Sequence, residues 1–133
     1  MLNPGVYTLG ALSITTALTG QAQTAIDDLD GMQAVTLEAS LSYGSGGTSV
    51  MALVQTSLDG GTIWRDVARF AFTTASATKH ATLSGMLSKA VTSYAALGSE
   101  GVYDSVLGDR LRLVVTTTGT YADTTLTVRA GVR

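Results

Sequence analysis

The sequence predicts an all-β protein, a single-domain β-sandwich or jelly-roll with a short N-terminal arm. Three observations support this prediction. Threonine and glycine are plentiful, whereas glutamate, lysine and glutamine, which favour helices, are scarce. Apolar and polar residues alternate with period two along several runs, as in strands with one buried face. Glycine-containing turns separate these runs, and the 133 residues suit one domain of about eight to ten short strands.

The N-terminal residues 1–20 alternate only weakly and predict an arm or an edge strand. We expect this segment to pair with another subunit or to pack against its own domain, and we expect the sandwich over 21–133. Strands are predicted at 35–42, 49–57, 64–72, 110–118 and 125–133. Turns are predicted at 43–49, 59–61, 97–101 and 118–124.

Three of these segments carry further expectations. The run 49–57 is apolar on both faces, which predicts a central strand covered on each side. The turn 118–124 joins two clear strands and is expected to close a C-terminal hairpin. Residues 83–98 combine helical spacing of apolar residues with β-formers and a glycine, and predict a short helix or an irregular strand.

Composition excludes several classes of function. Charged residues make up 14% of the chain, against about 25% in ordinary globular proteins, and the net charge is −2. The scattered Lys and Arg form no basic stripe for nucleic acid. Cysteine is absent, which rules out disulfides and thiolate metal sites, and no apolar run approaches the 18 residues of a membrane-spanning helix. So few charges predict a surface that packs against copies of itself or a larger assembly.

The stretch TSLDGGTIW, residues 56–64, resembles the Asp-box, a hairpin turn written S-x-D-x-G-x-x-W. Its residues here are Ser57, Asp59, Gly61 and Trp64. We interpret it as structural: aspartate accepts amide hydrogens in turns, glycine permits positive φ, and Trp64 is expected to be a large buried anchor. The motif occurs once, whereas a propeller would repeat it.

Other candidate sites lack the partners that chemistry requires. Asp28 and Asp30 resemble the start of a calcium loop, but no glutamate follows at the required spacing, so a solvated turn is preferred. His80, the single histidine, has no nucleophile elbow near it in the sequence. The GSGG stretch at 44–47 precedes a strand and predicts a hairpin tip instead of a phosphate loop. We therefore expect no enzyme, no cofactor and no metal.

The series YGSGGTSVMALVQTSLDGGTIWRDVARFAF at 43–72 and LGDRLRLVVTTTGTYADTTLTVRAGVR at 107–133 resembles a family of small virion structural proteins of tailed phages and prophages. The match spans roughly residues 33–133. The resemblance implies phage origin and a structural role among head and tail genes. Together with the low charge, it favours a capsid decoration (cement) protein, made in the bacterial host cytoplasm and carried on the capsid exterior.

The expected partners are the major capsid protein and copies of the chain itself, with a trimer as one arrangement, and neither nucleic acid nor membrane. The first alternative is a head–tail connector, a tail component or a head-fibre base. The second is a carbohydrate-binding β-sandwich module, because Tyr43, Tyr94, Tyr103 and Tyr121 fall in or near turns. For subunit contacts the sequence suggests the N-terminal segment and the 94–103 loop, with candidates Val6, Tyr7, Leu9, Leu12, Tyr94 and Tyr103.

Overall fold

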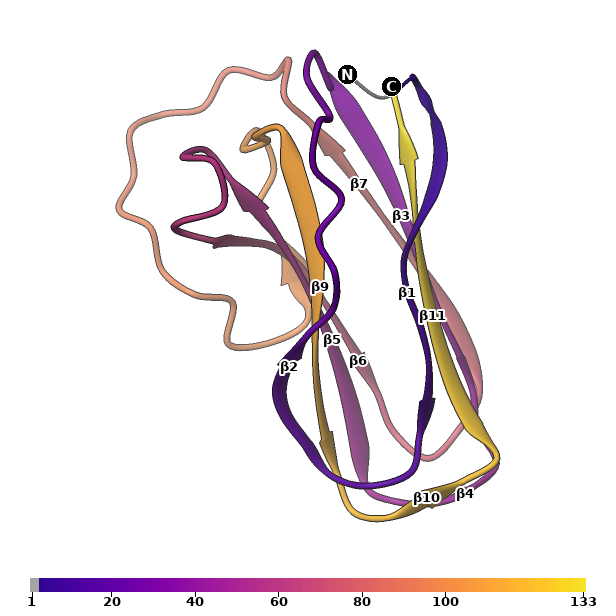
Figure 1. The fold of residues 1–133 in the computed structure, drawn as a ribbon. Coiled ribbons are helices and arrows are strands. Elements are labelled where there is room, and N and C mark those ends of the chain that lie inside the picture. Colours follow the sequence, from indigo (N-terminus) through magenta and orange to yellow (C-terminus); the bar gives the residue numbers. More distant parts are fainter. Residues whose placement is uncertain (1–2) are drawn as a thin grey trace.

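A computed structural model describes residues 3–133 and shows two antiparallel sheets packed face to face (Figure 1). No helix occurs in this range, and hence none that could span a membrane. The strands are β1 (Gly5–Ile14), β2 (Leu18–Ala22), β3 (Ala34–Ser42), β4 (Ser45–Gly46), β5 (Ser49–Ser57), β6 (Arg65–Phe72), β7 (Ala77–Ser84), β8 (Gly101–Val102), β9 (Arg110–Thr118), β10 (Tyr121–Ala122) and β11 (Thr124–Val132).

The strand pairing is that of a jelly roll. Among the eight strands of five or more residues, the first in the chain pairs with the last, β1 with β11. Moving inward along the chain, β2 pairs with β9, β3 with β7, and β5 with β6. Three further pairings, β3 with β11, β5 with β9 and β6 with β8, complete the sheets β1-β11-β3-β7 and β2-β9-β5-β6-β8. A long hairpin folded over in this way gives two stacked sheets, so the predicted fold class is confirmed.

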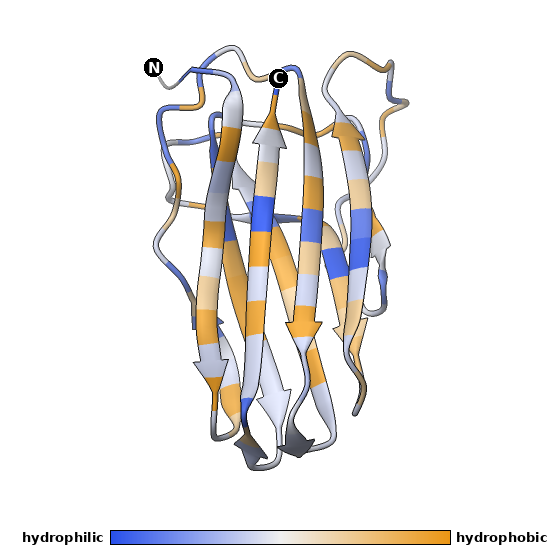
Figure 2. Ribbon diagram, turned by 90° about the vertical axis from the view of Figure 1, so that its right-hand side faces the viewer, coloured by the Kyte–Doolittle hydropathy of each residue, from blue (hydrophilic) through white to orange (hydrophobic). Residues whose placement is uncertain are grey.

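The core lies between the sheets and is built by alternate residues of each strand. On β3 and β11 every second side chain is buried, and the residues between them face outward. Figure 2 shows this alternation as hydrophobic and hydrophilic segments along the four-stranded sheet. The largest fully buried side chains are Ile14, Leu29, Leu37, Leu41, Leu83, Leu111, Leu113 and Leu126.

The expected C-terminal hairpin is wrong, because β9 and β11 lie in different sheets. Both strands bury one apolar face in the same core, for example through Leu113 and Val128. Their connection must therefore cross the sandwich, as must the connection from β3 to β5. These two crossing segments pair with each other through β4 and β10 and close one end of the molecule (Figure 1).

Tyr121 fills this closed end. Its side chain is buried, its hydroxyl donates to the Ser49 carbonyl at 2.8 Å, and it accepts the Thr48 amide hydrogen at 3.1 Å. At Gly47 φ is +67°, and a Cβ there would lie 1.9 Å from the tyrosine ring, so a side chain could not be accommodated. The glycine-rich GSGG stretch thus makes room for an aromatic cap and is not a free hairpin tip.

The N-terminal segment is not a loose arm. β1 pairs with β11 along its length and forms an edge of the four-stranded sheet, while β2 forms an edge of the other sheet. Met1 and Leu2, which belong to the expected arm, lie outside the described residues. The intramolecular alternative for the arm is thus the one observed.

Two other expectations need correction. Within the segment 83–98, β7 ends at Ser84, and the rest forms neither helix nor strand. β5 is central in its sheet, but on its outer face Met51 and Leu53 are only partly buried. The chain therefore buries one face of β5 fully and the other only in part, where the sequence predicted two covered faces.

We predict that Tyr121→Phe lowers the free energy of unfolding by about 0.5–1.5 kcal/mol, because the Ser49 carbonyl loses the tyrosine hydroxyl and the Thr48 amide keeps only its bond to the Thr118 carbonyl. Urea titration followed by circular dichroism measures the change. Tyr43→Phe is the matched control, since its hydroxyl donates only to the Gly46 carbonyl in a more exposed setting. Equal losses in the two variants would contradict the role given to Tyr121.

Candidate functional site

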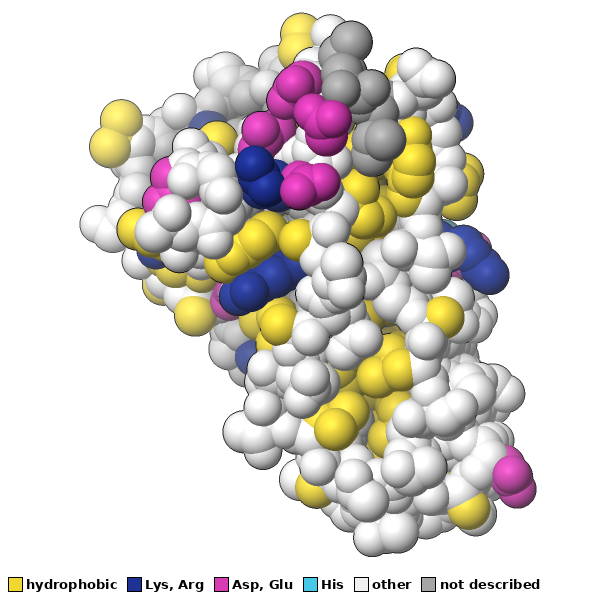
Figure 3. Space-filling view, viewed as in Figure 1, with side chains coloured by type: hydrophobic (Ala, Val, Ile, Leu, Met, Phe, Trp, Pro, Cys, Tyr) yellow, Lys and Arg dark blue, Asp and Glu magenta, His cyan; other side chains and the backbone are white. Residues whose placement is uncertain are grey.

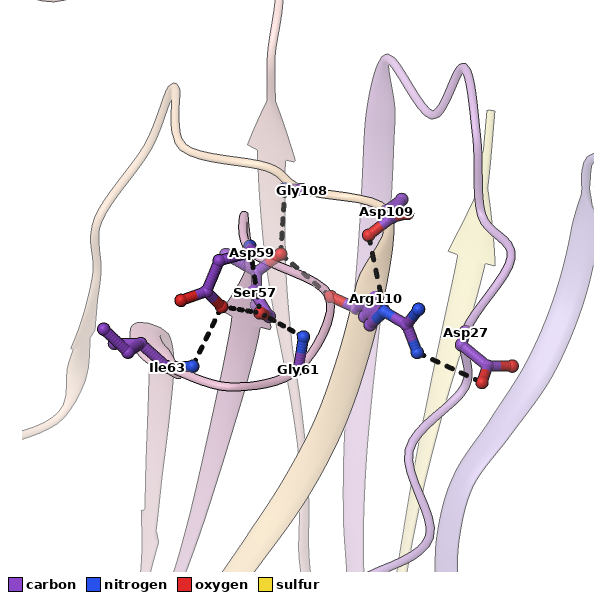
Figure 4. Close-up of polar contacts among 9 residues, drawn as sticks. Asp27, Ser57, Asp59, Gly61, Ile63, Gly108, Asp109 and Arg110 are labelled. Carbon is purple, nitrogen blue, oxygen red and sulfur yellow. Dashed lines mark hydrogen bonds and ion pairs between the residues drawn. The ribbon is translucent and has the colours of Figure 1, made fainter.

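The turn between β5 and β6 is held by its own serine and aspartate (Figure 4). Ser57 Oγ donates to Asp59 Oδ1 at 2.9 Å and accepts the Gly61 amide hydrogen at 2.9 Å. The same Asp59 oxygen accepts the Ile63 amide hydrogen at 2.9 Å. These bonds, led by the Ile63 amide, hold the pKa of Asp59 below its ordinary value of 3.8. The hydroxyl and the carboxylate therefore bond within the turn itself.

The segment after β8 packs closely under this turn. The Gly108 amide donates to Thr56 Oγ1 at 2.9 Å, and a Cβ at position 108 would lie 1.7 Å from the Ser57 carbonyl oxygen. Arg110 continues the contact, with Asp27 at 3.2 Å and Asp109 at 3.7 Å from its guanidinium nitrogens (Figure 4). The turn is thus fixed to the start of β9.

Trp64 is half-buried, and its expected role as a large buried anchor is wrong. The Arg112 guanidinium lies 4.4 Å from the ring centre, on the outer face of the five-stranded sheet. Arg112 Nε donates to Gln55 Oε1 at 2.8 Å, and Gln55 Nε2 donates to Asp66 Oδ1 at 2.8 Å. Burial lowers the pKa of Arg112. Trp64 therefore packs against the first residue of a hydrogen-bonded series that runs from Arg112 through Gln55 to Asp66.

Asp66 connects the sheet to the long loop 85–109. It is only 5% exposed, and its second carboxylate oxygen accepts the Leu97 amide hydrogen at 2.9 Å. The Asp66 amide donates to the Tyr94 hydroxyl at 3.0 Å. Arg69 Nη1 adds a bond to the Leu97 carbonyl at 2.5 Å. The middle of the loop is therefore fixed although it has no regular secondary structure.

Glu100 and Lys79 fix the end of the loop at the exposed edge of β6. Glu100 accepts the Ala71 amide hydrogen at 2.9 Å, and Lys79 Nζ lies 2.7 Å from the same carboxylate oxygen. Lys79 also donates to the Ala71 carbonyl at 2.6 Å, which links β7 of one sheet to β6 of the other. The Ala71 amide, followed by Lys79, holds the pKa of Glu100 below its ordinary value of 4.5.

The loop and the turn together expose most of the large apolar side chains on the surface. Among the described residues eight such side chains are exposed, and all but Val6 lie here. We name this set the apolar loop surface; its residues are Leu58, Ile63, Met86, Leu87, Val91, Tyr94 and Val102. Figure 3 shows hydrophobic side chains protruding on the side of the molecule that carries the loop. Exposed apolar side chains gathered on one side of a protein are typical of a binding interface.

A pocket of about 490 Å³ lies between the turn and the loop, and its lining includes Leu58, Arg65, Lys89, Tyr94 and Tyr103. The two tyrosine rings meet edge to face at 6.4 Å, and the Arg65 guanidinium lies 4.8 Å from the Tyr94 ring centre. The structure thus brings together the two tyrosines that the sequence named. Sequence reasoning missed Leu58, Arg65 and Lys89; the available signal was the apolar stretch 86–97 with a single charge.

The N-terminal candidates for subunit contacts divide into three kinds. Leu9 is 2% exposed in the core, so its expected role as a contact is wrong. Tyr7 and Leu12 are partly buried and pack against the core, whereas Val6 is exposed. Alternation along β1 turns most of these apolar side chains inward.

The remaining tyrosines do not reach the pocket. Tyr121 is buried in the closed end of the sandwich, and the Tyr43 hydroxyl donates to the Gly46 carbonyl at 2.7 Å near the same end. A sugar-binding platform, if present, is therefore limited to Tyr94 and Tyr103.

His80 lies on the outer face of the four-stranded sheet. Its Nε2 is 3.0 Å from Glu38 Oε2, its side chain is 59% exposed, and Arg129 approaches the same glutamate at 3.9 Å. These three residues occupy adjacent positions on β7, β3 and β11. No hydroxyl within residues 3–133 hydrogen-bonds to the imidazole. The row is an exposed cross-strand network of polar side chains.

The acidic segment 27–31 contributes to the turn that precedes β3. Asp27 pairs with Arg110, Leu29 is buried, and Asp28 and Gly31 have φ of +64° and +79°. Across residues 3–133, no three His, Asp or Glu side chains are placed to hold a metal ion together.

We predict that the attachment of the loop depends on pH through Glu100. Because its pKa is lower in the folded protein, its stabilising effect is present above pH 4.5 and is lost as pH falls through the folded-state pKa. The Ala71 amide resonance should titrate with a midpoint below 4.5, and Glu100→Gln should remove this step. A midpoint at or above 4.5 would contradict the contact.

No protein-family model matches the chain, and no curated protein matches it at a significant level.

Proposed function

We propose that this protein is a structural component of a bacteriophage particle, a decoration protein bound outside the shell between major capsid subunits. The observation that supports this best is the apolar loop surface, which gathers seven of the eight exposed large apolar side chains of residues 3–133. Such a surface suits docking against another protein. The sequence resemblance to phage structural proteins and the low charged share support the same proposal.

The magnitude of this surface fits a multi-copy assembly. Complete burial of a Val or Leu side chain contributes about 1.5–3 kcal/mol. Burial of these seven exposed side chains in an interface therefore offers on the order of 10 kcal/mol, similar to the 4–15 kcal/mol that association costs in lost freedom. A single contact of this kind would be modest, whereas many copies on a symmetric shell would add avidity.

The loop is ordered before any partner arrives. Asp66, Arg69 and Glu100 hold its backbone and its end against β6 through the bonds described above. Docking then does not have to order the loop, and the cost of binding is reduced. Within 86–97 only Lys89 is charged, so the complementary surface is expected to be apolar with few charges.

The pocket favours one second candidate, a carbohydrate-binding module. Tyr94 and Tyr103 offer aromatic surface, and Lys89 and Arg65 offer donors, within a volume typical of small-ligand sites. Glycan-array binding that Tyr94→Ala abolishes and Val91→Glu leaves unchanged would favour this candidate. Binding to virions that Val91→Glu abolishes and Tyr94→Ala leaves unchanged would favour decoration.

We predict that quantitative mass spectrometry of virions carrying this chain finds on the order of hundreds of copies per particle, as symmetric coverage of a shell requires. About a dozen copies or fewer would instead indicate the alternative of a connector or tail component. This count tests the place of the protein in the particle, independently of which surface it uses.

Val91→Glu should weaken binding to particles at least tenfold. Val91 is fully exposed, so the substitution places a charge in the interface without disturbing the fold. Co-sedimentation with shells stripped of this protein measures binding. The matched control is Thr125→Glu, an exposed position on the outer face of the other sheet, which should bind as the unmodified chain does. Equal binding by both variants would exclude the apolar loop surface as the contact.

A further inference from the structure

The two sheets have four edge strands, and three are poor templates for a further strand. β7 carries Lys79 and His80, and the Lys79–Glu100 pair links it to the neighbouring sheet. β8 contains two residues. β2 has a register irregularity between Leu18 and Gln21, with Gly20 at φ +55°. Charges, short length and irregularity are the usual means by which sheet edges avoid pairing.

β1 lacks most of these protections. It is ten residues long and contains no charged side chain. Half of its backbone N–H and C=O groups point away from β11, and no residue within 3–133 hydrogen-bonds to them. One bulge, between Thr8 and Gly10, interrupts it and leaves the regular segment Gly10–Ile14. The chain therefore presents one neutral strand edge of five residues.

An apolar strip lies beside this segment. Leu12 of β1 and Leu18 of β2 are only partly buried and border the open side of the core between the two sheets. Figure 3 shows hydrophobic side chains exposed in the lower half of this face, between β2 and β1. A strand added to β1 would cover this strip as well as satisfy the backbone groups.

We propose that β1 pairs with β1 of a second copy, antiparallel and centred on Leu12. A two-fold axis at this residue places Leu12 opposite its counterpart over the apolar strip and Ala11 opposite Ser13 on the outer face. All these side chains are small or neutral, so self-pairing meets no like-charge contact, whereas β7 paired with itself would bring together Lys79 and His80 from both copies. The two four-stranded sheets become one eight-stranded sheet, and the interface is isologous.

This contact is separate from the proposed docking surface. β1 lies at one side of the sandwich and the loop 85–109 at the other (Figure 1). A dimer through β1 therefore leaves both apolar loop surfaces free. Failure of either proposal leaves the other unaffected. The docking proposal is tested by binding to particles, and the β1 proposal is tested by the oligomeric state in solution.

The test is light scattering coupled to size-exclusion chromatography on the purified full chain. The unmodified protein should elute as a concentration-dependent dimer, and Ala11→Lys should weaken dimerisation at least tenfold. Thr127→Lys is the matched control, because Thr127 lies opposite Ala11 on β11, one strand in from the edge on the same face. It should dimerise as the unmodified chain does. A monomer at all concentrations, a trimer, or a dimer that Ala11→Lys leaves unchanged would overturn the proposal.

Cross-linking tests the register. The chain has no cysteine, so Leu12→Cys introduces a single thiol beside its symmetry mate, at a Cα separation that a disulfide can span. Mild oxidation should convert most of this variant to a covalent dimer, and Thr127→Cys should remain largely monomeric under reducing-agent-free electrophoresis. Cross-linking of both variants to the same extent would show random collision and overturn the centre at Leu12.

Discussion

The organisation of the candidate site depends on one buried carboxylate. Asp66 accepts from Gln55 on β5 and from the Leu97 amide in the loop, while its own amide donates to Tyr94. A buried charge is tolerated only when hydrogen bonds compensate for its lost hydration, and removal of one partner leaves the others unsatisfied. Sheet, loop and aromatic pair are therefore coupled: if the loop left the sheet, one oxygen of Asp66 would keep its bond to Gln55 and the other would lose the Leu97 amide.

The need to satisfy backbone hydrogen-bonding groups also explains how the open side of the sandwich near β6 is closed. The backbone of Ala71 finds no strand opposite, because β8 pairs only as far as Arg69. Glu100 and Lys79 supply the missing acceptor and donor from the loop and from the facing sheet. Two charged side chains thus make the hydrogen bonds that an edge strand would make. They also place charges where a strand of another chain would otherwise pair. β1, at the edge of the four-stranded sheet opposite β7, has no charged side chains in this position.

Local sequence pattern was enough to locate most long strands, because alternation reflects burial of one face at each residue. Its failures concern relations that depend on residues far apart. The turn 118–124 has hairpin chemistry, yet Tyr121 and its bonds to Thr48 and Ser49 direct the chain across to the other sheet. Trp64 was expected to be buried because of its size, but Arg112, 48 residues later, supplies a cover on the outer face.

The loop shows a different limit. The segment 83–98 has helical spacing of apolar side chains, and in a helix these side chains would need a face of the core to cover them. The sandwich offers none, because its inner faces are already filled by the strands. The backbone is instead held by Asp66, Arg69 and Glu100, and the apolar side chains remain outside. The same apolar spacing in sequence can belong to a helix packed on the core or to an exposed loop. Only the tertiary structure, which shows whether a core face is left for a helix to cover, distinguishes the two.

The positions of the two proposed contacts have a consequence for assembly. Under the proposed function, each apolar loop surface would provide an interaction whose favourable and unfavourable free-energy terms are of similar size. A dimer through β1 would carry two such surfaces on one rigid body, so engagement of the first would raise the effective concentration of the second. Binding would then be strong only where two sites on the shell are spaced to match the dimer. Two weak contacts held together in one dimer would therefore favour the assembled shell over a free capsid subunit, whereas a single strong contact would bind both equally.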